Sequence, residues 1–489
     1  MRRSPTGNPR LMKELNQSMI LELIREHECI SRADIAKELK LSPPTVSKIV
    51  NQLVADGWVD EIGAGESSGG RKPFLIKFNP RKHYAIGAYV GAGQIIVGLA
   101  DLDGRIYVRR SASRAPGGPG GAPSGGATVC GREQAAPAPG PGQAAILDTL
   151  IRLIEEVIEE ARIDSSKVCG IGVAVCGITR VENGTVVRAR HLPGWDNFPV
   201  RAVLEERFGV PVVADNDVYL AVLGESWRGA GKGVRDLVLV TLGQGVGCGI
   251  IINGKVYRGS TGAAGEIGDM IVTETAIERA QEKGGYLEVM AGWSTLVEHA
   301  AAGLGAGAGA RAGARAEVGA GVGAGAGGAD RESGSAAGGG DILARMAGGR
   351  PDRITPELVF EAARLGDDLA LDLVGRVSRY LAYTVANIIS LLNPEVVIIG
   401  GDVAQVGEVI LGPISDGVKS LLHSPPPILL SSLGRDAEIL GAVAVAIERA
   451  NPSLAISYDM SIIGAGDEIF AGAGAAGTAG NGNRNIGTA

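Results

Sequence analysis

One helix face carries polar side chains at a spacing suited to recognising another molecule. Thr45, Lys48 and Gln52 recur at intervals of three and four residues, and Ser47 and Asn51 lie beside them. This face lacks bulky side chains, so it can enter the major groove of a DNA duplex and offer donors and acceptors to base edges and phosphates. The residue types and their spacing therefore predict contact with DNA.

Two short helices separated by a turn would position this face. Ser31 can cap the first helix, with Asp34 in the reciprocal position three residues on, and Ser42 can cap the second. Pro43 then occupies the first helical position, where a missing N–H costs no hydrogen bond. The second helix has apolar residues at i, i+3, i+4 and i+7, which predict its buried side: Val46, Ile49, Val50 and Leu53.

A predicted β-hairpin follows the two helices, with strands at residues 58–62 and 74–78. Its glycine-rich tip ends in Arg71 and Lys72, whose cations could reach the phosphate backbone or the minor groove. Residues 15–79 together predict a winged helix-turn-helix, although a three-helix bundle with a solvated polar face would show the same helix spacing. The residues predicted to bind DNA are Ser42, Thr45, Ser47, Lys48, Asn51, Gln52, Arg71 and Lys72.

Charge is distributed unevenly along the chain. Residues 1–83 hold 14 Lys and Arg against 10 Asp and Glu, whereas the 489-residue chain has a net charge of −7. This bias supports DNA binding at one end, but only modestly by itself. No run of 18 apolar residues and no secretory signal is visible, and the five cysteines show no paired spacing. We therefore expect a cytoplasmic protein with reduced thiols and no membrane partner.

Three segments are dominated by Gly, Ala and Pro: residues 111–143, 301–350 and 464–489. They cannot bury enough apolar surface to offset chain ordering, which predicts two flexible insertions and a disordered tail. The predicted organisation is a DNA-binding domain at 1–79, a linker at 80–83, a second domain at 84–452 that contains both insertions, and a C-terminal segment at 453–489.

The second domain alternates apolar strands, glycine turns and amphipathic helices, which predicts an α/β fold with two lobes. Three strands in a meander and then a helix come first, at 84–90, 95–100, 106–109 and 144–162. A buried strand is predicted at 168–176, and a second sheet is predicted from strands at 210–214, 236–241 and 247–252. A long helix at 367–392 leads into a strand at 396–399.

Five motifs stand in a recognisable order in this domain: Leu192-Pro-Gly-Trp-Asp-Asn197, Asp215-Asn-Asp217, Gly243-Gln-Gly-Val-Gly247, Tyr257-Arg-Gly-Ser-Thr-Gly-Ala-Ala-Gly-Glu-Ile-Gly268 and Asn393-Pro-Glu-Val-Val-Ile-Ile-Gly-Gly401. With the winged helix, the chain resembles the ROK family of repressors and sugar kinases over about residues 15–450, apart from the insertions. The resemblance implies a two-lobed actin/hexokinase-like fold with a sugar in its cleft. It also implies a repressor branch that binds DNA as a homodimer or homotetramer.

The sugar half of the family site is largely present. Asn216 and Asp217 match the family's Asn-Asp pair, Glu266 matches the Glu of Glu-x-Gly-His, and Glu288 matches an acidic position further on. In a kinase Asp217 would accept the proton of the sugar hydroxyl, whereas in a sensor it would only accept a hydrogen bond. Without the resemblance, Asp217 could be a local helix cap and the two glutamates could be surface charges.

The nucleotide half departs from the family pattern. Tyr89 and Gly93 replace the carboxylate and the hydroxyl residue of the family's Asp-x-Gly-Gly-Thr, and Gln244 replaces the Thr of its second phosphate loop. The carboxylate that would serve Mg²⁺ is therefore missing, and Asp402 would add negative charge near a nucleotide. These changes together predict that ATP is not used and that the chain has no catalytic residue.

The zinc-binding part of the family pattern is altered as well. Asp269 replaces the family's His, and residues 273–285 contain no cysteine where the family's zinc loop would lie. The sequence therefore predicts no zinc and no other cofactor, with a short helix at 276–283 in place of the loop.

The residues predicted to bind the sugar are Asn216, Asp217, Glu266, Asp269 and Glu288. Four of these five side chains are carboxylates, and they would share one cleft. Like charges this close cannot all stay ionised cheaply. Either the ligand brings a cation or several hydroxyl donors, or an Arg or Lys enters the site, or the ligand response has been lost.

The leading interpretation is a repressor of carbohydrate-metabolism genes that binds double-stranded operator DNA and responds to a small sugar effector. An ATP-dependent sugar kinase with an appended DNA-binding head is the alternative. A DNA-binding protein whose second domain only oligomerises is the third.

Overall fold

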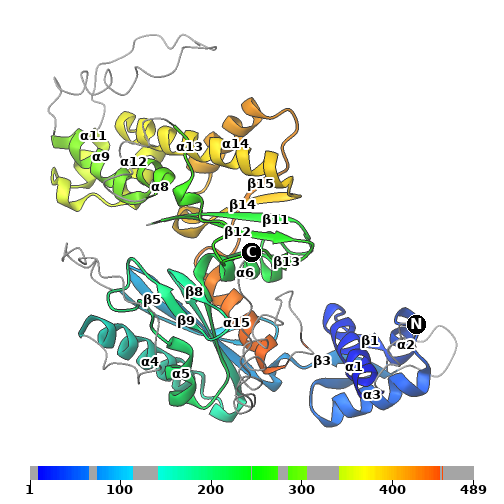
Figure 1. The fold of residues 1–489 in the computed structure, drawn as a ribbon. Helices are drawn as coiled ribbons and strands as arrows, with labels where there is room; N and C mark the ends of the chain where they lie inside the picture. The colour runs from blue at the N-terminus through cyan, green and yellow to red at the C-terminus, as the bar shows by residue number, and fades with distance from the viewer. Residues whose placement is uncertain are drawn as a thin grey trace, which may run out of the picture.

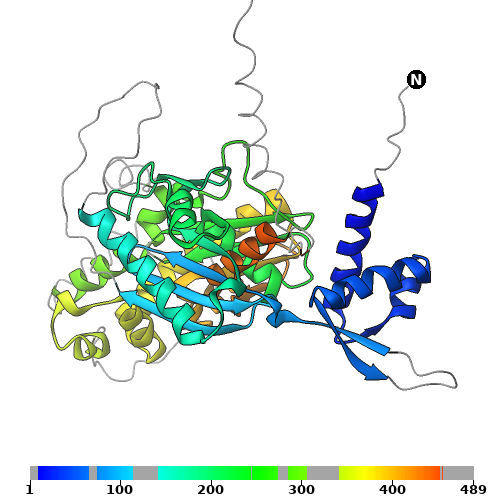
Figure 2. The ribbon, with the colours of Figure 1, turned by 90° about the horizontal axis from the view of Figure 1, so that it is seen from below.

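The computed structural model describes residues 9–64, 74–113, 141–243, 245–273, 285–305, 341–451 and 454. They form an N-terminal head and a body of two lobes, which are stacked one above the other in Figure 1. Figure 2 shows the head at one side of the body, with its β-hairpin pointing away from both lobes.

The head is the predicted winged helix-turn-helix. Its elements are α1 (Pro9–Glu26), β1 (Ile30–Ser31), α2 (Arg32–Glu38), α3 (Pro43–Ala55), β2 (Val59–Ala64) and β3 (Phe74–Phe78), with the sheet ordered β1-β3-β2. The caps are those predicted, because the Asp34 N–H donates to Ser31 Oγ at 3.2 Å and the Thr45 N–H donates to Ser42 Oγ at 3.3 Å. In a reciprocal cap the Asp34 side chain would accept from the Ser31 backbone N–H. Here it accepts instead from the Ser31 hydroxyl at 2.6 Å.

The apolar stripe of α3 holds the head together. Val46, Ile49, Val50 and Leu53 are all buried, as their spacing predicts, and they pack with buried residues of α1 and of the hairpin. The polar face of α3 is therefore turned outward by the burial of its opposite side.

The lower lobe contains a five-stranded sheet ordered β10-β7-β4-β5-β6. Its strands are β4 (Tyr84–Val90), β5 (Gln94–Asp101), β6 (Ile106–Ser113), β7 (Val168–Val175) and β10 (Val212–Asn216). Helices α4 (Pro141–Ala161) and α5 (Val200–Phe208) belong to this lobe, as does the hairpin of β8 (Ile178–Arg180) and β9 (Thr185–Arg188). The strand predicted at 210–214 was wrongly placed in the second sheet, because it pairs in parallel with β7 through Val212 and Ile171.

The upper lobe contains a second five-stranded sheet, ordered β13-β12-β11-β14-β15. Its strands are β11 (Leu237–Leu242), β12 (Val246–Ile252), β13 (Lys255–Val256), β14 (Val396–Gly400) and β15 (Ile428–Leu430). The helices of this lobe are α8 (Tyr286–Ala291), α9 (Trp293–Gly305), α11 (Asp341–Met346), α12 (Pro356–Arg364), α13 (Asp368–Leu392) and α14 (Glu408–Leu421).

Regular structure extends into both predicted insertions. Strand β6 continues to Ser113 and α4 begins at Pro141, while α9 reaches Gly305 and α11 begins at Asp341. The predicted bounds of 111–143 and 301–350 were therefore too wide, because a strand or a helix occupies the ends of both segments. Residues 114–140 and 306–340 lie outside the described residues, as does the C-terminal segment except for Leu454, which is buried.

The linker between head and body is folded. Residues Pro80–Lys82 form a 3₁₀ turn, which begins at Asn79. The Asn79 side chain donates to the Gly57 carbonyl at 3.3 Å, and the Lys82 ammonium lies 5.0 Å from the centroid of the Trp58 ring. A cavity of about 220 Å³ beside this turn is lined by residues of the head, the linker and the body: Trp58, His83, Leu102, Cys169, Pro211, Ile447, Ala450, Asn451 and Leu454.

Two helices connect the lobes. Helix α6 (Asp217–Arg228) follows β10, and α15 (Asp436–Ala450) packs against both α6 and the lower sheet. Glycines allow this packing to be unusually close, because a Cβ at Gly87 would overlap the Ile439 carbonyl and a Cβ at Gly172 would overlap the Ala442 carbonyl. The backbone of α15 therefore rests directly on β4 and β7.

Two further features concern the helices and the cysteines of the described residues. None of their helices has the length and apolar character needed to cross a membrane. Their cysteines, Cys29, Cys169, Cys176 and Cys248, are all free thiols.

We expect Gly172→Ala to destabilise the protein, because its new methyl group would overlap the Ala442 carbonyl and force α15 away from the sheet. Overpacking of this kind costs about 1–3 kcal/mol. Gly375→Ala is the matched control, since no atom lies within 4 Å of a Cβ at this position on α13. Chemical denaturation should show a loss for Gly172→Ala and no loss for Gly375→Ala, and equal effects would contradict the packing argument.

Candidate functional site

The polar face of α3 is accessible. Lys48, Asn51 and Gln52 are exposed, whereas Thr45 and Ser47 are half-buried. The Ser42 hydroxyl also lies 2.7 Å from Thr45 Oγ1, so these two side chains are engaged with each other at the start of the helix. The exposed centre of the face is therefore formed by Lys48 and its neighbours toward the C-terminal end of α3.

Other polar residues of the head are bonded within the head or lie outside the described residues. Gln52 donates to Asp56 Oδ1 at 2.9 Å, which directs its amide along the helix. Arg32 on α2 pairs with Glu61 on β2 at 2.5 Å and so ties the helices to the hairpin. Arg71 and Lys72 lie outside the described residues, and their role in the wing stays a prediction.

A second candidate site lies where β10 ends and α6 begins. Asn216 caps α6, since its Oδ1 accepts from the Val218 N–H at 2.9 Å and from the Tyr219 N–H at 3.2 Å. Its amide donates to the Gly177 carbonyl at 3.0 Å. Asn216 therefore spends most of its hydrogen-bonding capacity on the backbone around the site.

Asp217 is the first residue of α6, and its Oδ1 accepts from the Val218 N–H at 3.0 Å. Burial raises its pKa to about 7, although the Cys176 thiol bonds it and opposes that rise. Burial and the nearby Asp217 in turn raise the pKa of Cys176 well above its usual range. A fraction of the Asp217 carboxyls is therefore neutral near pH 7.

The other predicted acidic residues come from the upper lobe. Glu266 precedes η3 (Ile267–Asp269), and Glu288 lies in α8. Partial burial raises the pKa of Glu266, and the neighbouring Asp269 raises it further. Burial also raises the pKa of Glu288. The electrostatic coupling of Glu266 to Asp217 indicates that the cleft brings these predicted residues together.

Sequence reasoning missed three residues of this cleft. Arg190 opposes the rise in the pKa of both Glu266 and Glu288, and His191 opposes that of Glu288, while both side chains are themselves exposed. They directly precede the Leu192-Pro-Gly-Trp motif, which was the signal available for them. Cys176 follows β7, whose carboxyl end lies beside that of β10, and the sequence held no signal for it because this parallel pairing was not predicted.

The position of the first phosphate loop is filled by a side chain. Tyr89 lies near the end of β4, and a Cβ at Gly91 in the following turn would overlap its ring and hydroxyl. Burial raises the pKa of Tyr89 well above its usual range, and the nearby Asp217 contributes to that rise. Tyr89 therefore packs onto the turn that the family pattern reserves for phosphate.

The position of the second phosphate loop faces negative charge. Asp402 lies in η5 (Gly401–Val406), and its Oδ2 would be 3.2 Å from a Cβ at Gly243. Asp402 forms an ion pair at 2.8 Å with Arg435, the residue directly before α15. Glu438 in the first turn of α15 has its pKa raised to about 8 by burial. Gln244 lies outside the described residues.

The arrangement offers several oxygen acceptors beside a few donors, which suits a ligand with many hydroxyl groups. Within the described ranges, no group of three or more His, Cys, Asp or Glu side chains is placed to hold a metal ion. The loop at 274–284, where the family's zinc ligands would lie, is outside those ranges, so the absence of zinc stays a prediction.

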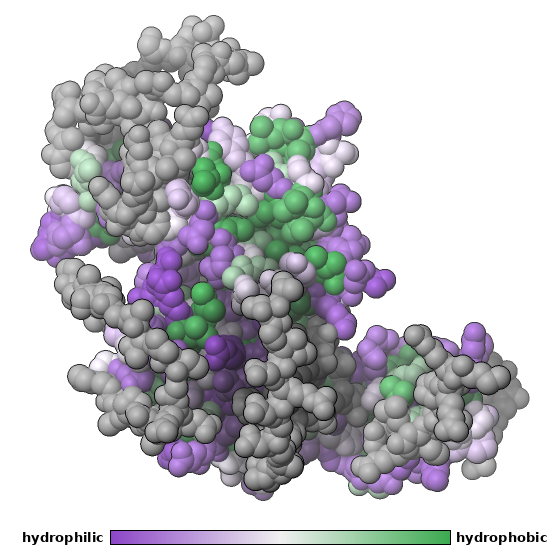
Figure 3. All heavy atoms as spheres, viewed as in Figure 1, coloured by the Kyte–Doolittle hydropathy of each residue, from purple (hydrophilic) through white to green (hydrophobic). Residues whose placement is uncertain are grey.

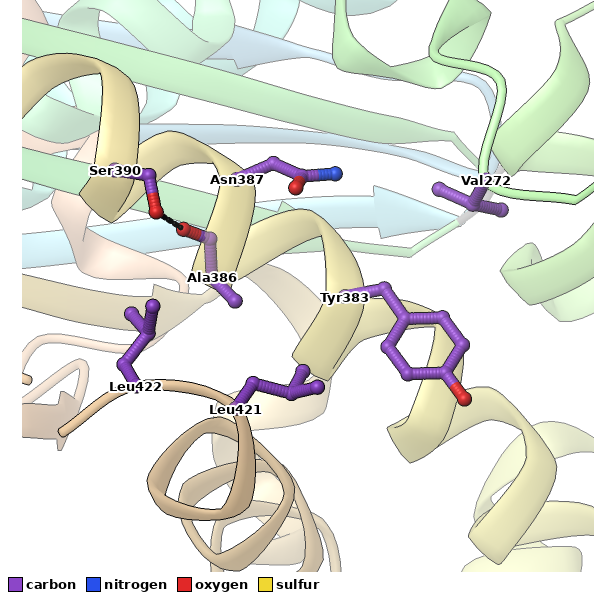
Figure 4. A pocket seen from close by; sticks show the side chains of 7 residues that line it. All are labelled: Val272, Tyr383, Ala386, Asn387, Ser390, Leu421 and Leu422. Carbon is purple, nitrogen blue, oxygen red and sulfur yellow. Dashed lines mark hydrogen bonds between the residues drawn. The ribbon is translucent and has the colours of Figure 1, made fainter.

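A cavity of about 370 Å³ lies elsewhere, between α13 and the end of α14 in the upper lobe. Figure 4 shows residues of α13 facing Leu421 and Leu422 at the end of α14, with the Ser390 hydroxyl bonded to the Ala386 carbonyl at 2.9 Å. None of the carboxylates of the cleft lines this cavity.

Two family models match the chain. "Winged helix-turn-helix DNA-binding" matches residues 14–60, and "ROK family" matches residues 134–449. A xylose repressor of Caldicellulosiruptor bescii is 28% identical over 90% of this chain and 97% of its own length.

Solved structures give the same fold. A ROK family transcriptional regulator, a homologue of the Escherichia coli Mlc protein, aligns over 92% of this chain and 99% of its own with a TM-score of 0.67 and 23% identity. A ROK family glucokinase of Streptomyces griseus, in complex with glucose and AMPPNP, aligns over 74% of this chain and 99% of its own with a TM-score of 0.57 and 27% identity. The predicted two-lobed kinase-like fold behind a winged head is confirmed, and the chain belongs to the ROK family.

Proposed function

We propose that this protein is a transcriptional repressor of carbohydrate-metabolism genes whose affinity for operator DNA is set by a sugar bound in the cleft. The observation that carries the proposal is the exposed polar face of α3, on a winged head that is folded onto a sugar-kinase-like body. The similarity to a xylose repressor over nearly the whole chain supports the same assignment. Closing of the lobes around the sugar would change the placement of the paired heads on DNA.

The cleft is suited to sensing a sugar rather than to phosphorylating it. Tyr89 fills the first phosphate loop, and Asp402 lies against the second, where a nucleotide would bring its own negative charge. Phosphoryl transfer depends on a cradle that neutralises phosphate charge, and the Tyr89 ring occupies the turn where the family pattern places that cradle. We therefore propose that the chain binds a sugar without catalysing its phosphorylation.

We propose a neutral, polyhydroxylated effector. Arg190 is electrostatically coupled to both Glu266 and Glu288, and we propose that it offsets their charge, which is one of the three outcomes expected for a crowded acidic cleft. Asp217 is partly neutral near pH 7, which lowers the negative charge further. The ligand then needs no cation of its own, and Asp217, Glu266, Asp269 and Glu288 remain to accept bonds from its hydroxyl groups.

We propose that the protein acts in the cytoplasm as a homodimer or homotetramer on a palindromic or repeated operator. Apolar surface supports association, because Figure 3 shows it gathered on the side of the upper lobe that carries α14 and β15. Leu421 of α14 and Leu429 of β15 are exposed, and Leu391 in the last turn of α13 is 81% exposed. Surface of this kind is typical of a contact between subunits.

A sugar kinase is the second candidate, because Asp217 keeps the position and the raised pKa of a general base. We expect no ADP release above that of Asp217→Asn when the protein is given ATP, Mg²⁺ and a panel of hexoses and pentoses in a coupled assay. Sugar-dependent release that Asp217→Asn abolishes would establish the kinase and overturn the sensor.

Lys48→Ala tests the DNA-binding face. The operator is first located by footprinting genomic DNA with the purified protein, and affinity is then measured by fluorescence anisotropy at several salt concentrations. We expect weaker binding and a salt slope smaller by about 1, since one phosphate contact is lost. Lys232→Ala, an exposed lysine of the body, should change neither quantity. An unchanged slope in Lys48→Ala would remove Lys48 from the phosphate contacts.

The pKa of Asp217 predicts how stability depends on pH. Its folded value of about 7 exceeds the ordinary value of 3.8, so folding favours the neutral carboxyl, and this stabilisation is lost as the pH rises from about 4 through 7. Asp217→Asn, which stays neutral, should therefore gain in Tm relative to the unaltered protein over that interval and level off above it. A constant difference in Tm between pH 4 and 8 would contradict the assignment.

A further inference from the structure

An ion pair connects the two lobes beside the cleft. Arg258 lies in the loop that follows β13 in the upper lobe, whereas Asp215 lies in β10 of the lower lobe. The contact is bidentate: Arg258 Nη1 donates to Asp215 Oδ1 at 3.0 Å, and Nη2 donates to Oδ2 at 2.5 Å. The side chains are 12% and 1% exposed, so water screens the pair little.

Tyr219 completes the connection. The Arg258 guanidinium lies 4.8 Å from the centroid of the Tyr219 ring. The Tyr219 hydroxyl lies 2.9 Å from the Gly262 carbonyl and 2.8 Å from the Ala264 carbonyl, and these two acceptors belong to the same loop as Arg258. One aromatic side chain of α6 therefore contacts both ends of the loop.

The backbone of this loop is rich in glycine. Gly259, Gly262 and Gly265 adopt positive φ angles of 71°, 74° and 88°, a conformation that glycine adopts easily and that leaves the unfolded loop many alternatives. Its own backbone contributes the Ala264 N–H bond to the Arg258 carbonyl at 3.0 Å, and the Gly265 carbonyl accepts from the Cys248 N–H at 2.9 Å. The next residue is Glu266.

We infer that Arg258 and Tyr219 are positioning residues of the effector site, which hold Glu266 opposite Asp217. Asp215 stands two residues before Asp217, so the ion pair fixes the lower-lobe half of the cleft and the upper-lobe half with the same contact. Neither residue has to touch the ligand. The inference rests on the proposed function only for the identity of the ligand as a sugar.

Tyr219→Phe tests the positioning without a ligand. It removes the hydroxyl that reaches the two carbonyls and keeps the ring beneath Arg258. Hydrogen–deuterium exchange of the full chain should show the amides of residues 258–268 exchanging about 10-fold faster, the size expected for the loss of a hydrogen bond. Tyr257→Phe is the matched control, because Tyr257 lies in the same loop with its ring 49% exposed. Equal exchange in Tyr219→Phe and Tyr257→Phe would overturn the inference.

A second measurement separates positioning from simple support of the fold. Calorimetric titration with D-xylose, D-glucose and N-acetyl-D-glucosamine should show Tyr219→Phe binding the preferred sugar about 10-fold more weakly, with unchanged operator affinity in the absence of sugar. Arg258→Lys should behave likewise, since a lysine cannot make the bidentate contact. Arg201→Lys, in a partly buried pair with Glu205 away from the cleft, should leave sugar affinity unchanged.

The two measurements distinguish the possible failures. Faster loop exchange with unaltered sugar affinity would overturn the positioning of Glu266. If the unaltered protein binds none of the three sugars, the proposed function fails for these sugars, while the exchange measurement still decides whether Tyr219 and Arg258 hold the loop.

Discussion

The close packing of the α15 backbone on the lower sheet is the constraint on which the rest of the body depends. At Gly87 and Gly172 no side chain separates the strands from the helix backbone, and at Gly224 a Cβ would overlap the Ala437 carbonyl, so α6 approaches α15 in the same way. Packed interiors transmit displacement because they have no free volume to absorb it. The first turn of α15 contains Glu438, which is electrostatically coupled to Asp217. Its last turn lines the cavity that also contacts Trp58 of the head.

Charge in the cleft is balanced by two different physical means. Asp215 is almost fully buried and is matched by a bidentate guanidinium, so its charge has a permanent partner. Asp217 is also buried, and burial raises its pKa to about 7. The charge of Asp215 is therefore balanced by a fixed partner and that of Asp217 by partial protonation, which suits a supporting role for Asp215 and, in the proposed sensor, ligand contact by Asp217.

Local signals in the sequence predicted local structure well. The caps at Ser31 and Ser42, the buried stripe of α3 and the boundaries of β4 all depend on residues close in sequence, and the structure agrees with each. The partner of β10 could not be predicted in this way, because parallel pairing with β7 joins segments about forty residues apart. The motifs brought Asp217 and Glu266 into the site, but the coupling of Arg190 to Glu266 joins segments of the two lobes that are distant in the sequence.

The contact between Tyr89 and Gly91 makes the two positions dependent on one another. Any side chain at position 91 would collide with the tyrosine ring, so glycine is required there for as long as an aromatic residue occupies position 89. Replacing Tyr89 by a small residue would lift that requirement, whereas the reverse order of changes passes through a clash. The hairpin therefore favours one order of changes, in which position 89 becomes smaller before position 91 accepts a side chain.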